Sequence, residues 1–194
     1  MRNLILLLIA LALSACVAIR PIDAQYQGQD AGYVVVSLSK APDANFSTFG
    51  PLITRAGTER TGAVDGVKLW IPPTGPYNVQ RVSFFEAGGP GAVFVLRLSS
   101  GQYQLGSFSA SRGISVNAEA WGAEPEINIP FEVRPGRVVY LGSYLAKEGV
   151  ASPGFFGSLT QLYFERRTEI DRDLSVARRV FSDLPTSVED LSSK

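Results

Sequence analysis

The sequence predicts a mainly β protein, an antiparallel β-sandwich with one amphipathic α-helix near its C-terminus. Between residues 31 and 166, short runs rich in β-branched and aromatic residues alternate with turns rich in Gly and Pro, a pattern typical of closely spaced strands. One later segment, residues 169–184, repeats its apolar residues with the period of a helix. Strands with an apolar face bury it against a second layer, which favours a sandwich or barrel.

The first strand is expected over residues 32–38 (GYVVVSL), where a tyrosine and three valines follow one another. Residues 39–66 are rich in Gly, Pro, Ser, Thr and Asp, and only residues 51–54 (PLIT) within them suit a short strand. Further strands are expected over residues 67–71, 77–86, 92–98 and 102–108, with turns at residues 72–73, 88–91 and 99–101.

The clearest predicted hairpin joins residues 127–133 (INIPFEV) to residues 138–144 (VVYLGSY). Both runs alternate apolar residues, and the residues between them, 134–137 (RPGR), hold a Pro followed by a Gly. This order of Pro and Gly is typical of a tight turn between paired strands. A last strand is expected over residues 159–166 (LTQLYFER).

Residues 169–184 are predicted to form a helix of about four turns that packs on the sandwich. Acidic residues lie at its start, and Arg178 and Arg179 lie near its end, where they complement the helix dipole. Pro185 ends the helix, and residues 186–194 are expected to be a mobile tail. The apolar stripe comprises Ile170, Leu174, Ala177, Phe181 and Leu184.

The N-terminus is predicted to carry an export signal, residues 1–15. Arg2 precedes residues 4–13, which are all Leu, Ile or Ala. A helix that spans a bilayer needs about 20 apolar residues, whereas this shorter run is typical of the core of a signal peptide. Residues 13–16 (LSAC) resemble the lipobox of bacterial lipoproteins. That resemblance implies that Cys16 is acylated and begins the mature chain.

The cysteine count agrees with acylation. Cys16 is the only cysteine in the chain, and a free thiol is a liability in an oxidising compartment. The alternative, an ordinary secretory signal cut near Ala15 or Ala18, leaves the thiol without a role. In lipoproteins of bacteria with two membranes, Asp after the cysteine favours the inner membrane, and here Val17 follows it. The resemblance therefore implies the outer membrane, with residues 16–30 as a lipidated tether and the body facing the periplasm.

Composition and charge narrow the function. Residues 31–185 suffice for one domain with a complete core. The chain holds 18 basic and 18 acidic residues, so nucleic acid is not expected as a partner. It contains no histidine, which removes the commonest general base and transition-metal ligand. Triads built on histidine are excluded, and no cofactor or metal is expected.

Two segments resemble an uncharacterised family of bacterial lipoproteins. Residues 98–105 (LSSGQYQL) resemble its strand motif Leu-Pro-Pro-Gly-x-Tyr-x-Leu, with Ser99 and Ser100 in place of the prolines. Residues 131–142 (FEVRPGRVVYLG) are similar to its hairpin motif Phe-x-Val-x-x-Gly-x-Val-Tyr-Leu-Gly. The resemblance covers about residues 92–185. It implies a transthyretin-like or carboxypeptidase-regulatory-like sandwich and no particular activity.

Aromatic residues in expected loops are the candidate binding residues. Trp121 lies in a polar segment, and Phe155 and Phe156 lie among Gly and Pro residues. Exposed aromatics in loops are typical of contact surfaces; core packing or plugging of a loop is the alternative role. Trp70 and Tyr144 belong to the same set of aromatics.

These observations favour a non-enzymatic, lipid-anchored envelope protein that binds a protein partner or serves an assembly, through an open strand edge of the sandwich. The alternative is a module that binds carbohydrate, peptidoglycan or a small ligand through Trp121, Phe155 and Phe156. A third hypothesis is a hydrolase that uses carboxylates alone. Its candidate residues are Glu119, Glu124 and Glu126.

Overall fold

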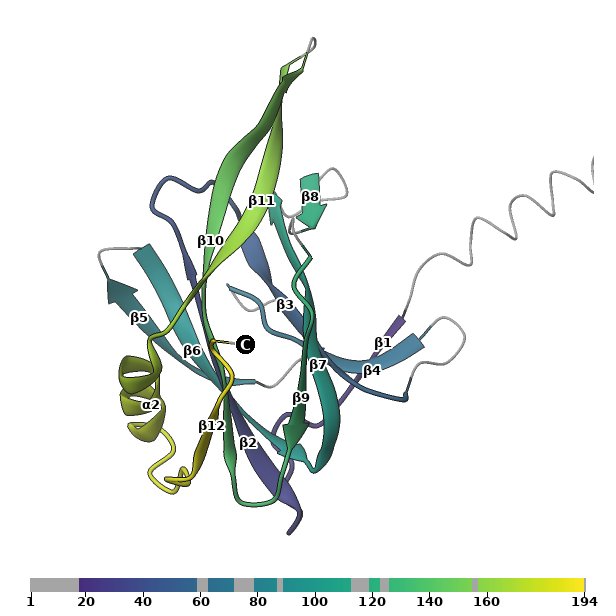
Figure 1. Cartoon of the computed structure of the whole chain (residues 1–194), viewed down its shortest axis with the longest axis vertical. Helices are drawn as coiled ribbons and strands as arrows, with labels where there is room; N and C mark the ends of the chain where they lie inside the picture. Colours follow the sequence, from purple (N-terminus) through teal and green to yellow (C-terminus); the bar gives the residue numbers. More distant parts are fainter. Residues whose placement is uncertain are drawn as a thin grey trace, which may run out of the picture.

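The computed structural model describes residues 18–58, 63–71, 79–86, 89–112, 119–122, 126–154 and 157–193. Its strands form two sheets that share a core, and in this part of the chain one helix packs on the outer face of the second sheet (Figure 1). The prediction of a mainly β sandwich with a C-terminal helix is confirmed.

The first sheet has the strand order β1-β4-β3-β7-β8, and β9 pairs with the N-terminal half of β7. Its strands are β1 (Ala18–Pro21), β3 (Thr48–Arg55), β4 (Ala63–Lys68), β7 (Gly101–Arg112), β8 (Glu119–Gly122) and β9 (Ile129–Val133).

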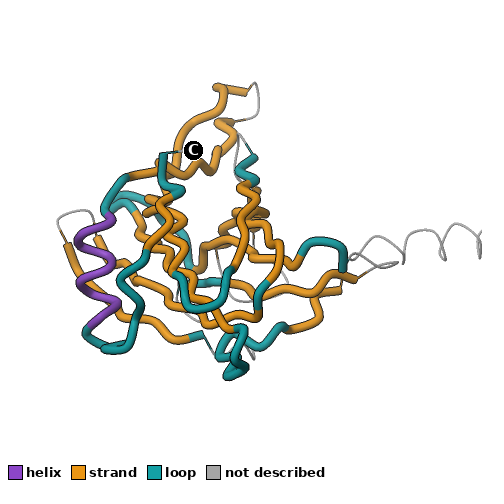
Figure 2. Tube along the Cα trace, turned by 60° about the horizontal axis from the view of Figure 1, so that its bottom comes forward, coloured by secondary structure: helices purple, strands orange, loops and turns teal. Residues whose placement is uncertain are grey.

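The second sheet has the strand order β11-β10-β2-β6-β5, and β12 pairs with β10. Its strands are β2 (Ala31–Lys40), β5 (Gln80–Glu86), β6 (Gly89–Ser99), β10 (Val138–Gly154), β11 (Gly157–Arg167) and β12 (Val188–Asp190). The helix α2 (Ile170–Arg178) follows β11, and Figure 2 shows it at the side of the molecule, outside the strands.

Strand β2 explains why the second sheet can hold a layer on each face. Val34, Val36 and Leu38 belong to the core between the sheets, whereas Tyr33 and Val35 belong to a second cluster with α2. A strand that is buried on both faces reads as a continuous apolar run. The predicted strand GYVVVSL is therefore a central strand.

The sheets are mixed, so the prediction of an antiparallel sandwich is wrong for some of the strand pairs. The pairs β1–β4, β2–β10 and β10–β12 are parallel, and the other strand pairs are antiparallel within the described chain. Parallel pairing needs a long connection between the two strands, and β2 and β10 lie about half of the chain apart.

The predicted hairpin around residues 134–137 is also wrong. The turn exists, since the Arg137 amide donates to the Arg134 carbonyl at 3.2 Å. However, β9 pairs with β7 in the first sheet, while β10 pairs with β2 and β11 in the second. The Gly136 amide donates to the Ala31 carbonyl, which ties the turn to β2 instead. The connection therefore crosses from one sheet to the other.

The helix is shorter than predicted and ends at Arg178, since turns follow it. Phe181 and Leu184 nevertheless pack with the apolar cluster under the helix. The apolar residues therefore keep a helical spacing beyond the end of the helix, because the turns place their side chains in the same apolar cluster.

Both expected mobile ends are partly built into the sheets. Strand β1 pairs with β4, and Ala24 is buried, so the tether predicted over residues 16–30 is ordered from Ala18 onward. At the other end β12 pairs with β10, and Leu191 is buried, so residues 186–194 are not a free tail. Polar, aperiodic segments order here because sheet edges offer them backbone partners. In the described part of the chain, no helix has the length and apolar character needed to cross a bilayer.

Candidate functional site

The structure describes only some of the site residues that the sequence predicts. Cys16, Phe155 and Phe156 lie outside them. Trp121 lies on β8, opposite Ala110 of β7, so the loop expected around it is a strand. The carboxylate candidates do not form a described site, because Glu119 is on β8, Glu126 is exposed before β9 and Glu124 lies outside the described residues.

The longest projecting feature is a two-stranded ribbon formed by β10 and β11. The pairing of β10 with β2 ends at Ala146, whereas its pairing with β11 continues to Gly154 opposite Gly157. Figure 1 shows this ribbon extending beyond the rest of the molecule at the top of the view. We call residues 149–154 and 157–161 the distal ribbon. Among the described strands, β10 and β11 have only each other as partners there.

Charged side chains stabilise the base of the ribbon, where Lys147, Glu148, Glu165 and Arg167 lie. Glu148 accepts a hydrogen bond from the Asn45 amide at 2.8 Å and pairs with Arg112 of β7. Glu165 pairs with Lys147 across the two strands and accepts from the Arg167 Nε at 2.8 Å. These cations, Lys147 first and then Arg167, hold the pKa of the Glu165 carboxyl below its usual value. The base is therefore fixed to the body.

The distal ribbon differs from its base in charge. Residues 149–164 contain no Asp, Glu, Lys or Arg, and the sequence of this segment includes Phe155 and Phe156. The ring of Tyr163 lies across the ribbon, 3.0 Å from the position of a Cβ at Gly149, and the residue is 37% exposed. Soluble proteins usually protect open strand edges with charge, Pro or a covering element. On β10 the ribbon carries Pro153 and a bulge between Val150 and Ser152, whereas β11 has no Pro. The uncharged edge of β11 is therefore the one suited to pairing with another chain.

A second candidate is an open groove of about 300 Å³ on the first sheet. It lies on the outer face, because the paired residues Leu52 and Lys68 line it, whereas their neighbours Ile53 and Val67 are fully buried in the core. The Lys68 ammonium lies 4.7 Å from the centroid of the Trp70 ring. The groove is lined by Ile19, Leu52, Lys68, Trp70, Ser107, Phe108 and Ser109.

A bulge shapes the groove where β3 pairs with β7. The register shifts between Gly50 and Leu52, and Ser107 adopts a left-handed φ of +47°. As a result Leu105 and Phe108 both enter the core although they are three residues apart. Bulges of this kind redirect side chains locally and are frequent beside functional sites.

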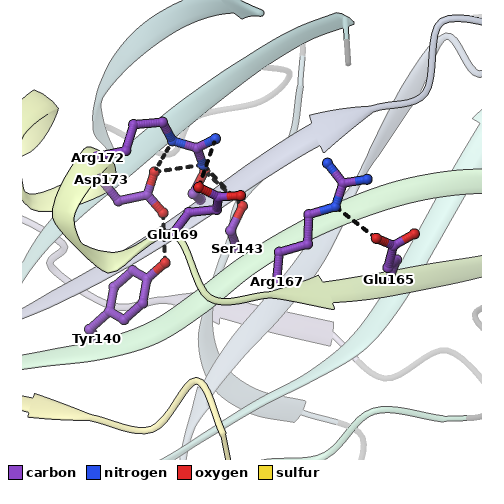
Figure 3. Close-up of polar contacts among 8 residues, drawn as sticks. Tyr140, Ser143, Glu165, Arg167, Glu169, Arg172 and Asp173 are labelled. Atoms are coloured by element: carbon purple, nitrogen blue, oxygen red, sulfur yellow. Dashed lines mark hydrogen bonds and ion pairs between the residues drawn. The ribbon is translucent and has the colours of Figure 1, made fainter. Parts of the chain in front are cut away.

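The third feature is a buried polar cluster between α2 and the second sheet (Figure 3). Asp173 is fully buried and accepts a hydrogen bond at 2.7 Å from the hydroxyl of Tyr140, which is also fully buried. The Arg172 Nε donates to the other oxygen of Asp173 at 2.9 Å, and Arg172 Nη2 donates to Ser143 Oγ at 3.2 Å. The Arg172 guanidinium also lies 4.8 Å from the centroid of the Phe84 ring.

This cluster holds the helix on the sheet. Burial raises the pKa of Asp173, although hydrogen bonds from Tyr140 and Arg172 oppose that shift. Burial, followed by the charge of Asp173, raises the pKa of Tyr140 well above its usual value. Both carboxylate oxygens already have protein donors. The arrangement therefore suits a structural role, since the carboxylate is held by the protein itself.

A scan against protein-family models finds no match for this chain, and searches of curated proteins and of solved structures find none either. The family resemblance of residues 98–105 and 131–142 therefore stays a prediction. The described residues hold no group of three or more His, Cys, Asp or Glu side chains suited to a metal ion.

Sequence reasoning missed most of the two candidate surfaces. Trp70 belongs to the candidate aromatics, but Ile19 lies in the predicted tether and Leu52 in a predicted short strand that carries no site residue. Four strands meet in the groove, and no local pattern shows that they meet. The distal ribbon left a signal that could have been used, namely the long uncharged run of residues 149–164.

Proposed function

We propose that this protein is a lipid-anchored, non-enzymatic envelope lipoprotein that binds a protein partner through the distal ribbon. One observation carries the proposal: a paired, projecting strand segment without charge, whose outer edges have no partner among the described strands. An isolated two-stranded hairpin is at best marginally stable in water. A partner strand that adds to one edge would supply the missing backbone hydrogen bonds.

The contrast within the ribbon supports a partner at its far end. At the base, Lys147, Glu165 and Arg167 place charges where an added strand would meet them, and such charges protect edges against pairing. The charges stop at Gly149, and β11 has no Pro in their place. Recognition would therefore combine main-chain hydrogen bonds with apolar contacts from Tyr163 and the aromatic pair Phe155 and Phe156.

The proposed anchor is the acylated Cys16, which would keep the protein at the outer membrane with its body in the periplasm. Each buried acyl methylene contributes about 0.8 kcal/mol, and more than one chain is needed for durable anchoring. The absence of histidine from the sequence supports a binding function over acid–base catalysis.

The partner surface is tested by photo-crosslinking in intact envelopes. With p-benzoylphenylalanine in place of Tyr163, we expect one discrete protein adduct, because this side chain lies on the ribbon face and is 37% exposed. The matched control carries the same group in place of Val180, which is 52% exposed and lies just after α2. The control is expected to give no such adduct, as judged by immunoblot and mass spectrometry.

A second variant separates the distal ribbon from its base. Replacing residues 150–160 with Asn-Gly keeps the Gly149–Gln161 pair and the braced base, and Asn-Gly favours a two-residue hairpin turn. The shortened protein should keep its melting temperature and lose the adduct at position 163. Equal adducts at both positions, adducts with lipid only, or no adduct would contradict the proposed surface.

The anchor is tested by Cys16→Ser and fractionation of cells. We expect the wild-type protein in the outer-membrane fraction and the variant in a soluble or uncleaved form, because serine cannot form the thioether. Val17→Asp serves as the matched control, since it keeps the acylation site and is expected to shift the protein toward the inner membrane. A mature Cys16→Ser body that stays with the outer membrane would show that something other than lipid holds it.

A further inference from the structure

The first strand of the first sheet begins close to the proposed acylation site, Cys16. Strand β1 starts at Ala18, two residues after Cys16. An extended residue spans at most about 3.6 Å, so the Cα of Ala18 lies within about 7 Å of the Cα of Cys16. Ala18 and Ile19 pair with Ala63 and Val64 of β4. An acyl anchor on Cys16 would therefore hold the edge of the sheet directly, without a long flexible tether between lipid and sheet.

The surface beside that edge has the chemistry of a membrane interface. Ile19, Leu52 and Trp70 line the groove on the outer face of the sheet, where a sandwich ordinarily presents polar residues to water. The Lys68 ammonium sits over the Trp70 ring. Trp is enriched at the level of the lipid headgroups, and Lys extends its ammonium from such apolar surfaces toward polar groups.

We propose that the β1–β4 edge and its groove rest on the bilayer that holds Cys16, with Trp70 and Ile19 at the boundary between headgroups and acyl chains. Lys68 then faces lipid phosphates. The occupant of the groove is phospholipid of the anchoring membrane, because the chain leads from the groove to the lipidated residue within three positions. This inference rests on the proposed acylation of Cys16 and adds a fixed orientation of the body to it.

The proposed orientation of the body also determines whether the ribbon can reach a partner. In Figures 1 and 2 the β1–β4 edge lies to one side of the molecule and the ribbon extends from another. A body that rests on the membrane through β1 and β4 would leave the β10–β11 ribbon available to a partner. The same anchor thus serves both surfaces.

The test uses the acylated protein in vesicles made of phosphatidylcholine brominated near the headgroup end of its acyl chains. The chain has two tryptophans, so Trp121→Phe leaves Trp70 as the only one. We expect Trp70 to lose most of its emission relative to vesicles of unbrominated lipid. The matched control, Trp70→Phe/Trp121→Phe/Tyr163→Trp, places the single tryptophan on the ribbon, where emission should stay close to its unbrominated level.

Flotation on a density gradient distinguishes this inference from the anchor itself. If the protein floats with the vesicles but Trp70 is not quenched, or the ribbon tryptophan is quenched as strongly, the orientation is wrong and the anchor stands. If the acylated protein does not float, both proposals are overturned. Should Trp121→Phe fail to fold, the difference in quenching between wild type and Trp70→Phe gives the same comparison.

Discussion

Replacing Asp173 with alanine is expected to lower the free energy of unfolding by about 3 kcal/mol or more, because it removes the centre of the buried cluster under α2. The Tyr140 hydroxyl, which is fully buried, loses its acceptor. Arg172 loses the charge that it contacts at 2.8 Å. Leaving buried polar groups without partners costs more than the bonds themselves contribute. Chemical denaturation measures the change.

Two variants control for this effect. Asp171→Ala removes an exposed acid from the same helix turn and should cost less than about 0.5 kcal/mol. Tyr140→Phe removes a single hydrogen bond to Asp173 and should cost about 1 kcal/mol. A loss in Asp173→Ala no larger than in Asp171→Ala would show that the cluster does not hold the helix.

The pH dependence of the same variants gives an independent readout. Burial raises the pKa of Asp173 in the folded state above the unfolded value of about 3.9, so the folded state binds more protons in the interval between the two. The contribution of this group to stability is therefore complete below the unfolded pKa and is lost as the pH rises through the folded pKa. Asp173→Asn should flatten the unfolding free energy over that interval; an unchanged pH profile would contradict the raised pKa.

Gly50→Ala is expected to destabilise the protein by about 3 kcal/mol or more, since overpacking and backbone strain act together there. Gly50 has a φ of +150°, and a Cβ on it would lie 1.7 Å from the carbonyl oxygen of Leu69. Neither atom can move freely, because Phe49 and Ile71 exchange two backbone hydrogen bonds beside them. Thermal melting and the yield of soluble protein measure the loss.

The matched control for this variant is Gly57→Ala. Gly57 also has a left-handed φ, +74°, but a Cβ there would meet no atom within 4 Å. Its cost should be about 1 kcal/mol, from the backbone conformation alone. If the two variants melt at the same temperature, the close approach of β3 to residues 69–71 is not what requires glycine at position 50.

Strand positions were largely predictable because burial leaves a local pattern. The run around Val34 to Val36 is apolar at every position since the second sheet is covered on both faces, and the run after Val138 is buried for the same reason. The helix start was predictable from its acids and apolar spacing. Its end was not, because Phe181 and Leu184 keep the spacing while the backbone turns.

Strand partners were not predictable, since they depend on residues far apart in the chain. The Pro-Gly turn at residues 134–137 suits a hairpin, yet the turn crosses the sandwich because the Gly136 amide donates to β2 and the Arg137 carbonyl accepts from it. Residues 18–21 and 188–190 carry no strand pattern and order only because β4 and β10 offer them an edge. The local sequence of such a segment does not show which distant strand it will pair with, although that pairing is what makes it a strand.

Composition and short-range periodicity were enough to predict a mainly β body, a helix near the C-terminus and the absence of histidine chemistry. Three features become visible only in the folded protein: Asp173 is buried against Tyr140, Ile19 and Trp70 line one groove, and β10 and β11 extend beyond the neighbouring strands. Each of these depends on which strands lie side by side. The arrangement of the strands depends on the packing of the whole core, in which contacts between distant segments support one another.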